Sequence, residues 1–459
     1  MVVRWFGSYR KIILAFLSVI ICGIFVYVIY CSYVLLNGRH ELQEAIDEAD
    51  AIDPGWRMAD LEKSRGSIPD DENSALQVQK AESLIPQDWG KPTEKQSLGA
   101  TGENSESAVM IKRSLIEARK LAGFQNGRYP FDRSMVPLMN RSLTDKAQRV
   151  AWLLDWDARK LNKQGKTHEA VTSCRAILAA GRSIGDEPSI FSQILRLRIR
   201  NLAVRSMERA LAEGEVSEDA LRELQIELLT EEAHPLLLIM IRAERALWHE
   251  SLQSCENGDF PFEQLVSSGS GAPFDPASIS RLFLPDSHAW IIRYFNNLVQ
   301  VAMGPQGKQI EKMGILAETI TCAPAQTKLI FADQPGFYLR QADNILASRG
   351  LLLCAATALA CERFRLKNNR WPSSLVELVP EYLREPPRDA NDATPLELQV
   401  LRDKIIIHTR RFQENDKTDA VAKENSASEQ CQASFTLLNP SKRGKNQLNE
   451  NGNENIPME

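Results

Sequence analysis

The sequence lacks the short motifs that identify the commonest enzyme and metal-binding classes. No CxxC pair occurs, which gives no support to a zinc or thioredoxin-type site. No P-loop, G-x-S-x-G or GxGxxG pattern stands in a strand–turn–helix setting. His249 and Glu250 begin like the zinc motif HExxH, but Gln253 occupies the place of the second histidine. The sequence therefore assigns no catalytic residue, and we expect no cofactor and no metal.

An excess of positive charge is also missing, with 55 Lys and Arg against 60 Asp and Glu. A dedicated nucleic-acid-binding protein shows a strong basic excess on one face, so we expect no nucleic-acid partner. One helix, 188–213, alternates arginines with Leu and Ile. We interpret it as a core helix whose exposed basic side pairs with the next helix, and a binding surface is the alternative. The residues are Arg196, Arg198, Arg200 and Arg205, with Glu218, Asp219, Glu223 and Glu227 as acidic neighbours.

The longest uncharged run is IILAFLSVIICGIFVYVIYCSYVLL at residues 12–36. As a helix it would be about 37 Å long, enough to cross a hydrocarbon layer of about 30 Å with some tilt. A core helix of a soluble protein is the alternative, but such a helix rarely lacks a polar face over this length. We therefore predict one transmembrane helix in contact with the lipid bilayer.

The residues on either side of this run predict its orientation. Arg4, Arg10 and Lys11 precede it, whereas acidic residues dominate positions 41–50. The positive-inside bias places residues 1–11 in the cytoplasm and the bulk of the chain on the periplasmic side of a cell envelope. A cleaved signal peptide has an apolar region of about 7 to 15 residues followed by a small-x-small site. Because the run is longer and ends among tyrosines, we predict an uncleaved signal anchor.

Helical periodicity follows over most of the chain. Residues 37–107 are predicted to form juxtamembrane helices and a flexible linker that begins at Gly66. Residues 108–337 are predicted to form an α-helical domain, either an array of helical hairpins or an irregular bundle. The expected helices cover 110–121, 143–164, 167–184, 188–213, 217–230, 235–254, 287–303 and 307–322.

A small C-terminal α+β unit is predicted for residues 338–440. A long helix over 338–369 is followed by LELQVL at 396–401 and IIIHT at 405–409, which alternate like a β-hairpin. A third strand is predicted at 433–438. The segment 412–430 and the tail 441–459 are polar in composition and are predicted to be disordered. The predicted fold class is therefore mainly α with one small sheet.

Residues 157–188 read DARKLNKQGKTHEAVTSCRAILAAGRSIGDEP and resemble a tetratricopeptide-type helix pair. Gly165 stands where the two helices approach each other, and Ala170 and Ala176 lie on the second helix. Any packed helical hairpin favours small residues at its crossing, and no 34-residue period follows. A repeat array and an irregular bundle both remain open.

Three segments outside the helical domain carry a second resemblance. PGWR stands at 54–57, PDDEN at 69–73 and ALACERFRLKNNRWPSSLVELVPEYLREPPRDANDATPL at 358–396. With the anchor and the helical middle, this order resembles a family of large membrane-anchored proteins from planctomycete bacteria, over about residues 40 to 440. That family has no assigned activity, so the resemblance implies an architecture and no site.

The C-terminal segment has a Trp-Pro-x-x-Leu turn followed by a loop that contains Pro and Asp. It resembles the globular end of type II secretion pseudopilins through Trp371, Pro372, Leu375, Leu378, Tyr382 and Leu383. Such pseudopilins can hold calcium with loop oxygens, which implies Asp389 and Asp392 as candidates here. Ala390 and Ala393 replace the usual Pro and Gly, and two aspartates do not supply six to eight oxygens. Unlike in a pseudopilin, a whole helical domain separates this unit from the membrane helix.

Cysteines and paired carboxylates offer no further pattern. Six cysteines outside the membrane run are irregularly spaced, and Cys354 and Cys361 lie too far apart on one helix, about 10 Å, for a disulfide. We interpret them as small buried hydrophobic residues. Glu231, Glu232 and His234 are interpreted as a solvated helix end, and Asp155 and Asp157 as side chains on different faces. The six cysteines are Cys174, Cys255, Cys322, Cys354, Cys361 and Cys431.

Three functional hypotheses follow from the sequence. The first is a non-enzymatic interaction or scaffold protein of the cell envelope, with protein partners bound by the helical domain. The second is an envelope hydrolase or protease whose site is formed by residues distant in the sequence, and the third is a secretion-related component. An enzyme predicts a compact pocket where at least two polar groups with perturbed ionisation face each other.

Overall fold

The computed structural model describes residues 2–90, 106–130, 145–260, 283–410 and 433–444, with side chains from Phe16 onward. These residues are mainly helical and form two compact units, each assembled from segments that are separate in the chain. Unit 1 comprises Met1–Asp60, Arg245–Gln300 and Ile315–Phe337. Unit 2 comprises Leu61–Glu244, Val301–Gly314 and Tyr338–Glu459.

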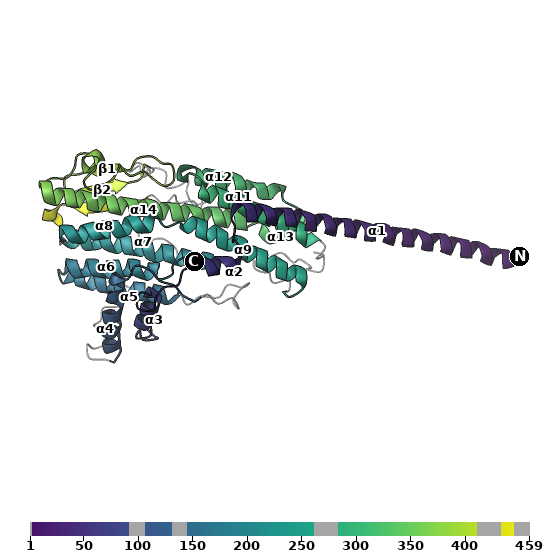
Figure 1. Cartoon of the computed structure of the whole chain (residues 1–459), viewed down its shortest axis with the longest axis horizontal. Helices are drawn as coiled ribbons and strands as arrows, with labels where there is room; N and C mark the ends of the chain where they lie inside the picture. The colour runs from purple at the N-terminus through teal and green to yellow at the C-terminus, as the bar shows by residue number, and fades with distance from the viewer. Residues whose placement is uncertain (1, 91–105, 131–144, 261–282, 411–432, 445–459) are drawn as a thin grey trace, which may run out of the picture. The chain divides into compact units, whose positions relative to one another are not determined.

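Unit 1 contains α1 (Val2–Ile52), an unbroken helix of 51 residues (Figure 1). Large apolar side chains between Phe16 and Leu36 are exposed, with both of these residues at 67%. By length and composition this part of the helix is able to span a membrane. From Gly38 onward the same helix becomes amphipathic, and Ala45 and Ala49 are buried in the unit. The apolar run and the charged helix expected after it are therefore one continuous element.

The rest of unit 1 packs against the second half of α1. Parts of α9 (Leu236–Asn257) and α11 (Leu284–Met303) belong to this unit, as does α13 (Ala325–Phe331). Ala45, Ala49 and Trp56 form a small core with Ala289 and Ile292 of α11. A second apolar cluster consists of aromatic rings in edge-on or stacked contact, from Trp248, Trp290, Tyr294, Phe295 and Phe331.

Unit 2 is built on three helices that pack side by side, α5 (Asp145–Lys163), α6 (Thr167–Arg182) and α7 (Ile190–Glu213) (Figure 1). Gly165 joins the first two with φ +70°, a left-handed conformation that glycine adopts at little cost. The Ser189 and Ser217 side chains cap α7 and α8 (Glu218–Glu232). The helical hairpins predicted between 143 and 230 are confirmed.

The segment before α5 also contributes to this core. Asn73 caps α3 (Ser74–Glu82), whose Ala75, Val78 and Ala81 are buried in the same apolar cluster as α5 and α6. The next helix, α4 (Glu106–Arg119), continues into the 3-10 turn η2 (Lys120–Gly123). The PDDEN segment therefore ends in a helix cap: its Asn73 also accepts a hydrogen bond from the Arg128 amide at 2.9 Å.

The C-terminal part of unit 2 combines a long helix with one sheet. Most of α14 (Gln334–Asn368) belongs to this unit and is buried. Strands β1 (Glu397–Val400), β2 (Lys404–His408) and β3 (Ser434–Leu438) form an antiparallel sheet in the order β1-β2-β3. Ile405 pairs with Leu437 and Ile407 with Phe435, and all four side chains are buried. The hairpin and the third strand are confirmed, and their alternation excludes a one-residue shift, which would turn the apolar side chains to the other face.

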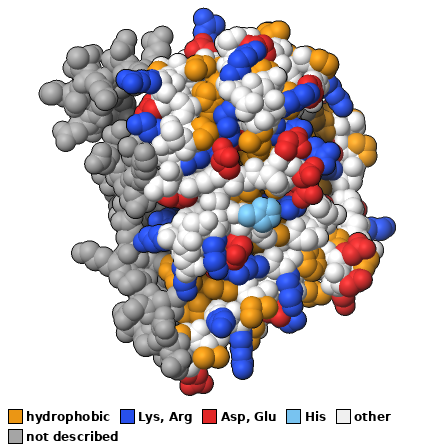
Figure 2. All heavy atoms as spheres, turned by 90° about the vertical axis from the view of Figure 1, so that its left-hand side faces the viewer, with side chains coloured by type: hydrophobic (Ala, Val, Ile, Leu, Met, Phe, Trp, Pro, Cys, Tyr) orange, Lys and Arg blue, Asp and Glu red, His pale blue; other side chains and the backbone are white. Residues whose placement is uncertain are grey.

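The surface of unit 2 carries charges of both signs. On the face drawn in Figure 2, Lys and Arg are interspersed with Asp, Glu and apolar side chains, without an extended field of one sign. This mixture agrees with the near balance of charge in the sequence. The face has the charge pattern of an ordinary soluble surface.

Gly127 gives a test of the packing in unit 2. A Cβ at this position would lie 2.5 Å from Ser183 Cα, so the backbone itself would have to move. We expect Gly127→Ala to lower the free energy of unfolding by about 3 kcal/mol, measured by denaturant unfolding of the full chain in detergent. Gly123→Ala is the control, because a Cβ there meets nothing within 4 Å. Equal stability of the two variants would contradict the described packing.

Candidate functional site

Two buried polar clusters stand out among the described residues, one in each unit. In unit 1, Glu256, His288 and His249 form a hydrogen-bonded series that we call the histidine chain. In unit 2, Arg65, Arg128, Arg196 and Arg200 form what we call the arginine cluster, together with their carboxylate partners. Neither cluster is contiguous in the sequence.

The histidine chain links α9 to α11 through two imidazole rings. His288 Nδ1 lies 2.8 Å from Glu256 Oε1, and His288 Nε2 lies 3.0 Å from His249 Nδ1. An ionised carboxylate only accepts hydrogen bonds, so Nδ1 of His288 donates to it. In the tautomer of His288 that carries its proton on Nδ1, Nε2 accepts from His249 Nδ1, and the lone pair of the series is left on His249 Nε2. This tautomer assignment follows from the hydrogen-bond partners.

Trp56 of the PGWR segment packs over the end of the histidine chain. Its indole ring is fully buried and meets the His249 ring edge-on, with centroids 4.9 Å apart. Its Nε1 donates to Asp50 at 3.0 Å, and Asp50 also accepts two hydrogen bonds from Arg57. The Arg57 and Arg245 guanidinium groups lie 5.1 and 5.0 Å from the centre of the indole ring. The PGWR segment therefore links α1 to α9 through the contacts of Trp56 and Arg57.

Burial controls the ionisation of His249. Burial, the neighbouring His288 and the Arg57 charge lower its pKa to about 3, so the ring is neutral at physiological pH. Asp50 has a lowered pKa because it accepts hydrogen bonds from Arg57. A carboxylate that orients one imidazole, which in turn orients another, is an arrangement that can hold and relay a proton. Within the described ranges, no group of three His, Cys, Asp or Glu residues has the geometry to hold a metal ion.

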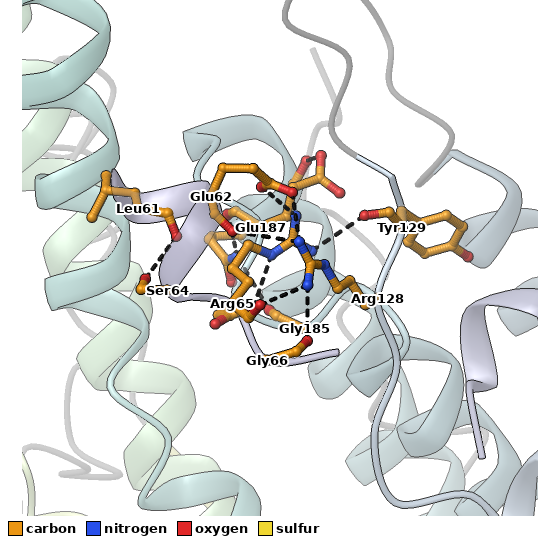
Figure 3. A network of polar contacts seen from close by, with 12 residues as sticks. Leu61, Glu62, Ser64, Arg65, Gly66, Arg128, Tyr129, Gly185 and Glu187 are labelled. Atoms are coloured by element: carbon orange, nitrogen blue, oxygen red, sulfur yellow. Dashed lines mark hydrogen bonds and ion pairs between the residues drawn. The ribbon is translucent and has the colours of Figure 1, made fainter. Parts of the chain in front are cut away.

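The arginine cluster begins just after α2 (Met58–Ser64). Arg65 donates to Asp186 at 3.0 Å and to Glu62 at 2.8 Å, and its Nη2 reaches the carbonyl of Tyr129. Arg128 donates to the other oxygen of Glu62 and to the carbonyl of Arg65. Figure 3 shows these groups converging between the end of α2, the segment at 128–129 and the loop that contains Gly185 and Glu187. The cluster fastens three chain segments to one another.

The second half of the arginine cluster lies between α7 and α8. Arg196 and Arg200 are buried, and both donate to Glu231 at 3.0 to 3.3 Å. Although burial acts to raise the pKa of Glu231, the two guanidinium charges override it and lower the pKa to about 2. Arg196 also lies 2.8 Å from His234 Nε2, and burial together with that charge lowers the pKa of His234 to about 4.

Two interpretations of the sequence are corrected here. The helix end at Glu231 and His234 is not solvated, and the basic side of α7 is exposed only at Arg198 and Arg205. The reason is that α7 is buried over most of its circumference, so arginines at 196 and 200 face the protein. Their partner is Glu231, and the acidic residues expected opposite them pair elsewhere: Glu223 and Glu227 with Arg175, Glu218 with Arg363, and Asp219 with Arg222.

The other carboxylates singled out by the sequence have structural partners. Asp155 accepts from Ser206 and Arg209, whereas Asp157 accepts from Arg119 and Ser173. The two side chains therefore take different partners, as their spacing on the helix predicts. Asp389 and Asp392 accept hydrogen bonds from amides two residues ahead, at 3.0 and 2.9 Å, which shapes the loop into turns.

Glu244 is a perturbed carboxyl in unit 2. It is buried and accepts a hydrogen bond from the Tyr338 hydroxyl at 2.8 Å. Burial raises its pKa to about 7, and the tyrosine offsets only part of this effect. No local pattern in the sequence predicts the burial of Glu244.

Ser183 lies in a G-x-S-x-G pattern that the sequence analysis sets aside for lack of a strand–turn–helix setting. The pattern covers 181–185 at the end of α6, and the Ser183 hydroxyl is buried. It donates to the Ala180 carbonyl at 2.7 Å and lies 3.3 Å from the Tyr129 hydroxyl. A catalytic serine of this motif stands exposed between a strand and a helix, so Ser183 is a packing residue.

No disulfide joins the described cysteines. Cys174, Cys255, Cys354 and Cys361 are buried, which agrees with their interpretation as small apolar residues, and burial raises the pKa of the Cys354 and Cys361 thiols. Cys322 differs from these because it is exposed. Cys431 and the polar segment 412–430 lie outside the described residues.

Comparison with known proteins adds no family to this picture, since no family model, curated protein or solved structure matches the chain. The resemblances to tetratricopeptide pairs, planctomycete anchored proteins and pseudopilins remain predictions. The histidine chain is the site that sequence reasoning missed. His249 and His288 are 39 residues apart, on helices whose patterns give no sign that they meet.

Glu231 gives a test of the arginine cluster. Replacing it in Glu231→Gln leaves two buried guanidinium groups without a counter-charge, and we expect the free energy of unfolding to fall by about 3 to 5 kcal/mol. Denaturant unfolding of the full chain in detergent measures this loss. Asp219→Asn on the same helix is the control, because its pair with Arg222 is exposed and contributes less than about 1 kcal/mol. A loss no larger than that of the control would show that the cluster is not a structural centre.

Proposed function

We propose that the chain is a membrane-anchored protein of a cell envelope whose helical body lies outside the cytoplasm and acts as a scaffold for other proteins. The continuity of α1 carries this proposal. Exposed apolar residues up to Leu36 and packed residues from Gly38 belong to one helix. Exposed apolar surface of this extent favours insertion into a bilayer or contact with another protein, and a single helix of this length fits a bilayer.

The change from apolar run to packed protein takes place within two residues. A Cβ on Gly38 would lie 3.2 Å from the amide nitrogen of Asp286 and 3.4 Å from the side chain of Pro285. With a rise of about 1.5 Å per residue, the beginning of α11 lies within about one helical turn of the end of the apolar run. This close approach supports a body that stands directly on the membrane surface, joined to its anchor by a continuous helix.

The ion pairs of the buried carboxylates in unit 2 favour a binding role of this unit over a catalytic role. Glu231 and Asp157 are satisfied by arginines of neighbouring helices, which makes them structural groups. Arrays of packed helices present long surfaces to protein partners. The periplasmic orientation rests on the charges that flank the apolar run.

An acid–base enzyme of the envelope is the second candidate, and the histidine chain is the observation that favours it. Glu256 orients His288, and His288 orients His249, as expected of a relay that ends on a basic nitrogen. The pKa of His249, lowered to about 3 by burial, argues against this candidate because a general base works best with a pKa near the operating pH. The scaffold is therefore the preferred proposal.

Membrane anchoring is tested by placing charges on the exposed face of α1. Lysine near the centre of a span costs about 3 kcal/mol per residue, so the double variant Ile20→Lys with Val26→Lys is expected to leave the carbonate-resistant membrane fraction. Both positions are exposed, at 44% and 60%. His40→Lys, exposed beyond the apolar run, is the control and should stay in the membrane. Retention of the double variant in that fraction would contradict the proposal.

Orientation is tested with the chain's own exposed thiol. Treatment of intact cells with a membrane-impermeant maleimide should modify Cys322, identified by peptide mass spectrometry, if the body is outside the cytoplasm. Cys354 and Cys361 are internal controls that should react only after unfolding, because both are fully buried. Modification of Cys322 only after cell lysis would reverse the assigned orientation.

Scaffold and enzyme make different predictions for His249→Asn. Affinity capture of the full chain from solubilised membranes should recover the same partners with wild type and variant at pH 7, and the variant should still complement a deletion strain. Loss of complementation with unchanged partners would favour the enzyme. Recovery of secretion-system subunits would favour the secretion-related role, and recovery of no partner would contradict the scaffold.

A further inference from the structure

The second half of α1 is held in unit 1 by a junction that we call the anchor joint. It consists of Ala45, Ala49 and Trp56 packed on Ala289 and Ile292 of α11. Two polar contacts close it: Asn296 donates to the Ala45 carbonyl at 3.1 Å, and Arg245 pairs with Asp53. Arg293 adds a partly exposed ion pair with Glu41 at 2.6 Å.

The two histidines lie at the side of this joint where α9 meets α11. His249 comes from α9 and contacts Trp56, and His288 comes from α11, one residue before the packed Ala289. Their ring nitrogens are 3.0 Å apart, and the side chains of both histidines are buried. The hydrogen bond between them therefore belongs to the contact that keeps α11 and Trp56 together.

We propose that this histidine pair makes the packing of α1 within unit 1 dependent on pH, so that the anchor joint is closed at neutral pH and opens in acid. The joint is a property of unit 1 by itself. That its opening loosens the body from a membrane rests on the proposed function.

Burial of His249, together with the charges around it, explains why acid opens the joint. Arg57 and His288 oppose a positive charge on the His249 ring, and Asp50 favours one more weakly. On α9 itself, Arg245 adds a cation over Trp56 at 5.0 Å, and Glu256 is already hydrogen-bonded to His288. A protonated His249 ring would be a buried cation close to Arg57 and 3.0 Å from the His288 ring nitrogen, to which its Nδ1 is hydrogen-bonded. Protonation of His249 is therefore unfavourable while the joint is closed.

The sign of the pH dependence follows from this difference. In the closed joint the pKa of His249 is lowered to about 3, whereas a ring released into water has its ordinary pKa of about 6.5. Between these values the open form binds one proton more, so opening becomes more favourable as the pH falls. For one such histidine the opening equilibrium constant rises about 25-fold between pH 7 and pH 5.

Hydrogen exchange of the full chain in detergent micelles, read by mass spectrometry at pH 7 and pH 5, tests the proposal. After correction for the intrinsic exchange rate, peptides covering 53–60 and 284–292 should show an opening constant about 25-fold larger at pH 5. Peptides from α5 and α6 in unit 2 serve as the internal reference. An opening constant of the joint that does not change with pH in the wild-type chain overturns the proposal without any variant.

His249→Asn identifies the group that is responsible. The asparagine amide takes the place of Nδ1 and keeps a donor for His288, but it does not titrate, so most of the 25-fold rise should disappear. His168→Asn, at an exposed position on α6, is the matched control and should keep the wild-type rise. An unchanged rise in His249→Asn would overturn the assignment. Hydrogen exchange in micelles does not depend on membrane anchoring in cells. A failure of the pH-dependent joint and a failure of the proposed anchoring can therefore be told apart.

Discussion

Buried arginines paired with carboxylates from other chain segments are the constraint on which the rest of the structure depends. A guanidinium group cannot be left in an apolar interior without a counter-charge, so each pair determines which helices must meet. The pairs join the end of α1 to α9, α7 to α8, and α14 to the segment after the last strand. They are Arg245 with Asp53, Arg196 and Arg200 with Glu231, and Arg443 with Glu362.

The histidine chain differs from these pairs in a way that matters for function. Arginine stays charged at every pH that the protein meets, so loss of the arginine charge does not break its ion pair. Histidine changes charge near neutrality, and His249 and His288 sit where α9 and α11 hold the second half of α1. Unit 1 thus combines arginine ion pairs, such as Arg245 with Asp53, and the contact between His249 and His288, which we propose that acid breaks. The anchor helix is held by both.

Local signals predicted the elements well and the sites poorly. The helices of unit 2 and the strands at 397–400, 404–408 and 434–438 follow from apolar spacing and caps, which depend only on neighbours in the chain. The prediction that the basic side of α7 is exposed was wrong in part, because burial depends on what packs against a helix. Two arginines that looked like surface residues became the partners of Glu231.

The sequence by itself determined the apolar segment of α1, the positions of the helical hairpins and the three strands of the small sheet. These depend on hydrophobic periodicity over a few residues, which a chain carries wherever it folds. Only the tertiary structure decided that α1 continues without a break into unit 1, that Trp56 covers His249, and that His249 meets His288. Contacts between residues far apart in the chain, such as the 39 positions between His249 and His288 and the 192 between Asp53 and Arg245, arise from packing and charge neutralisation, which no local pattern contains.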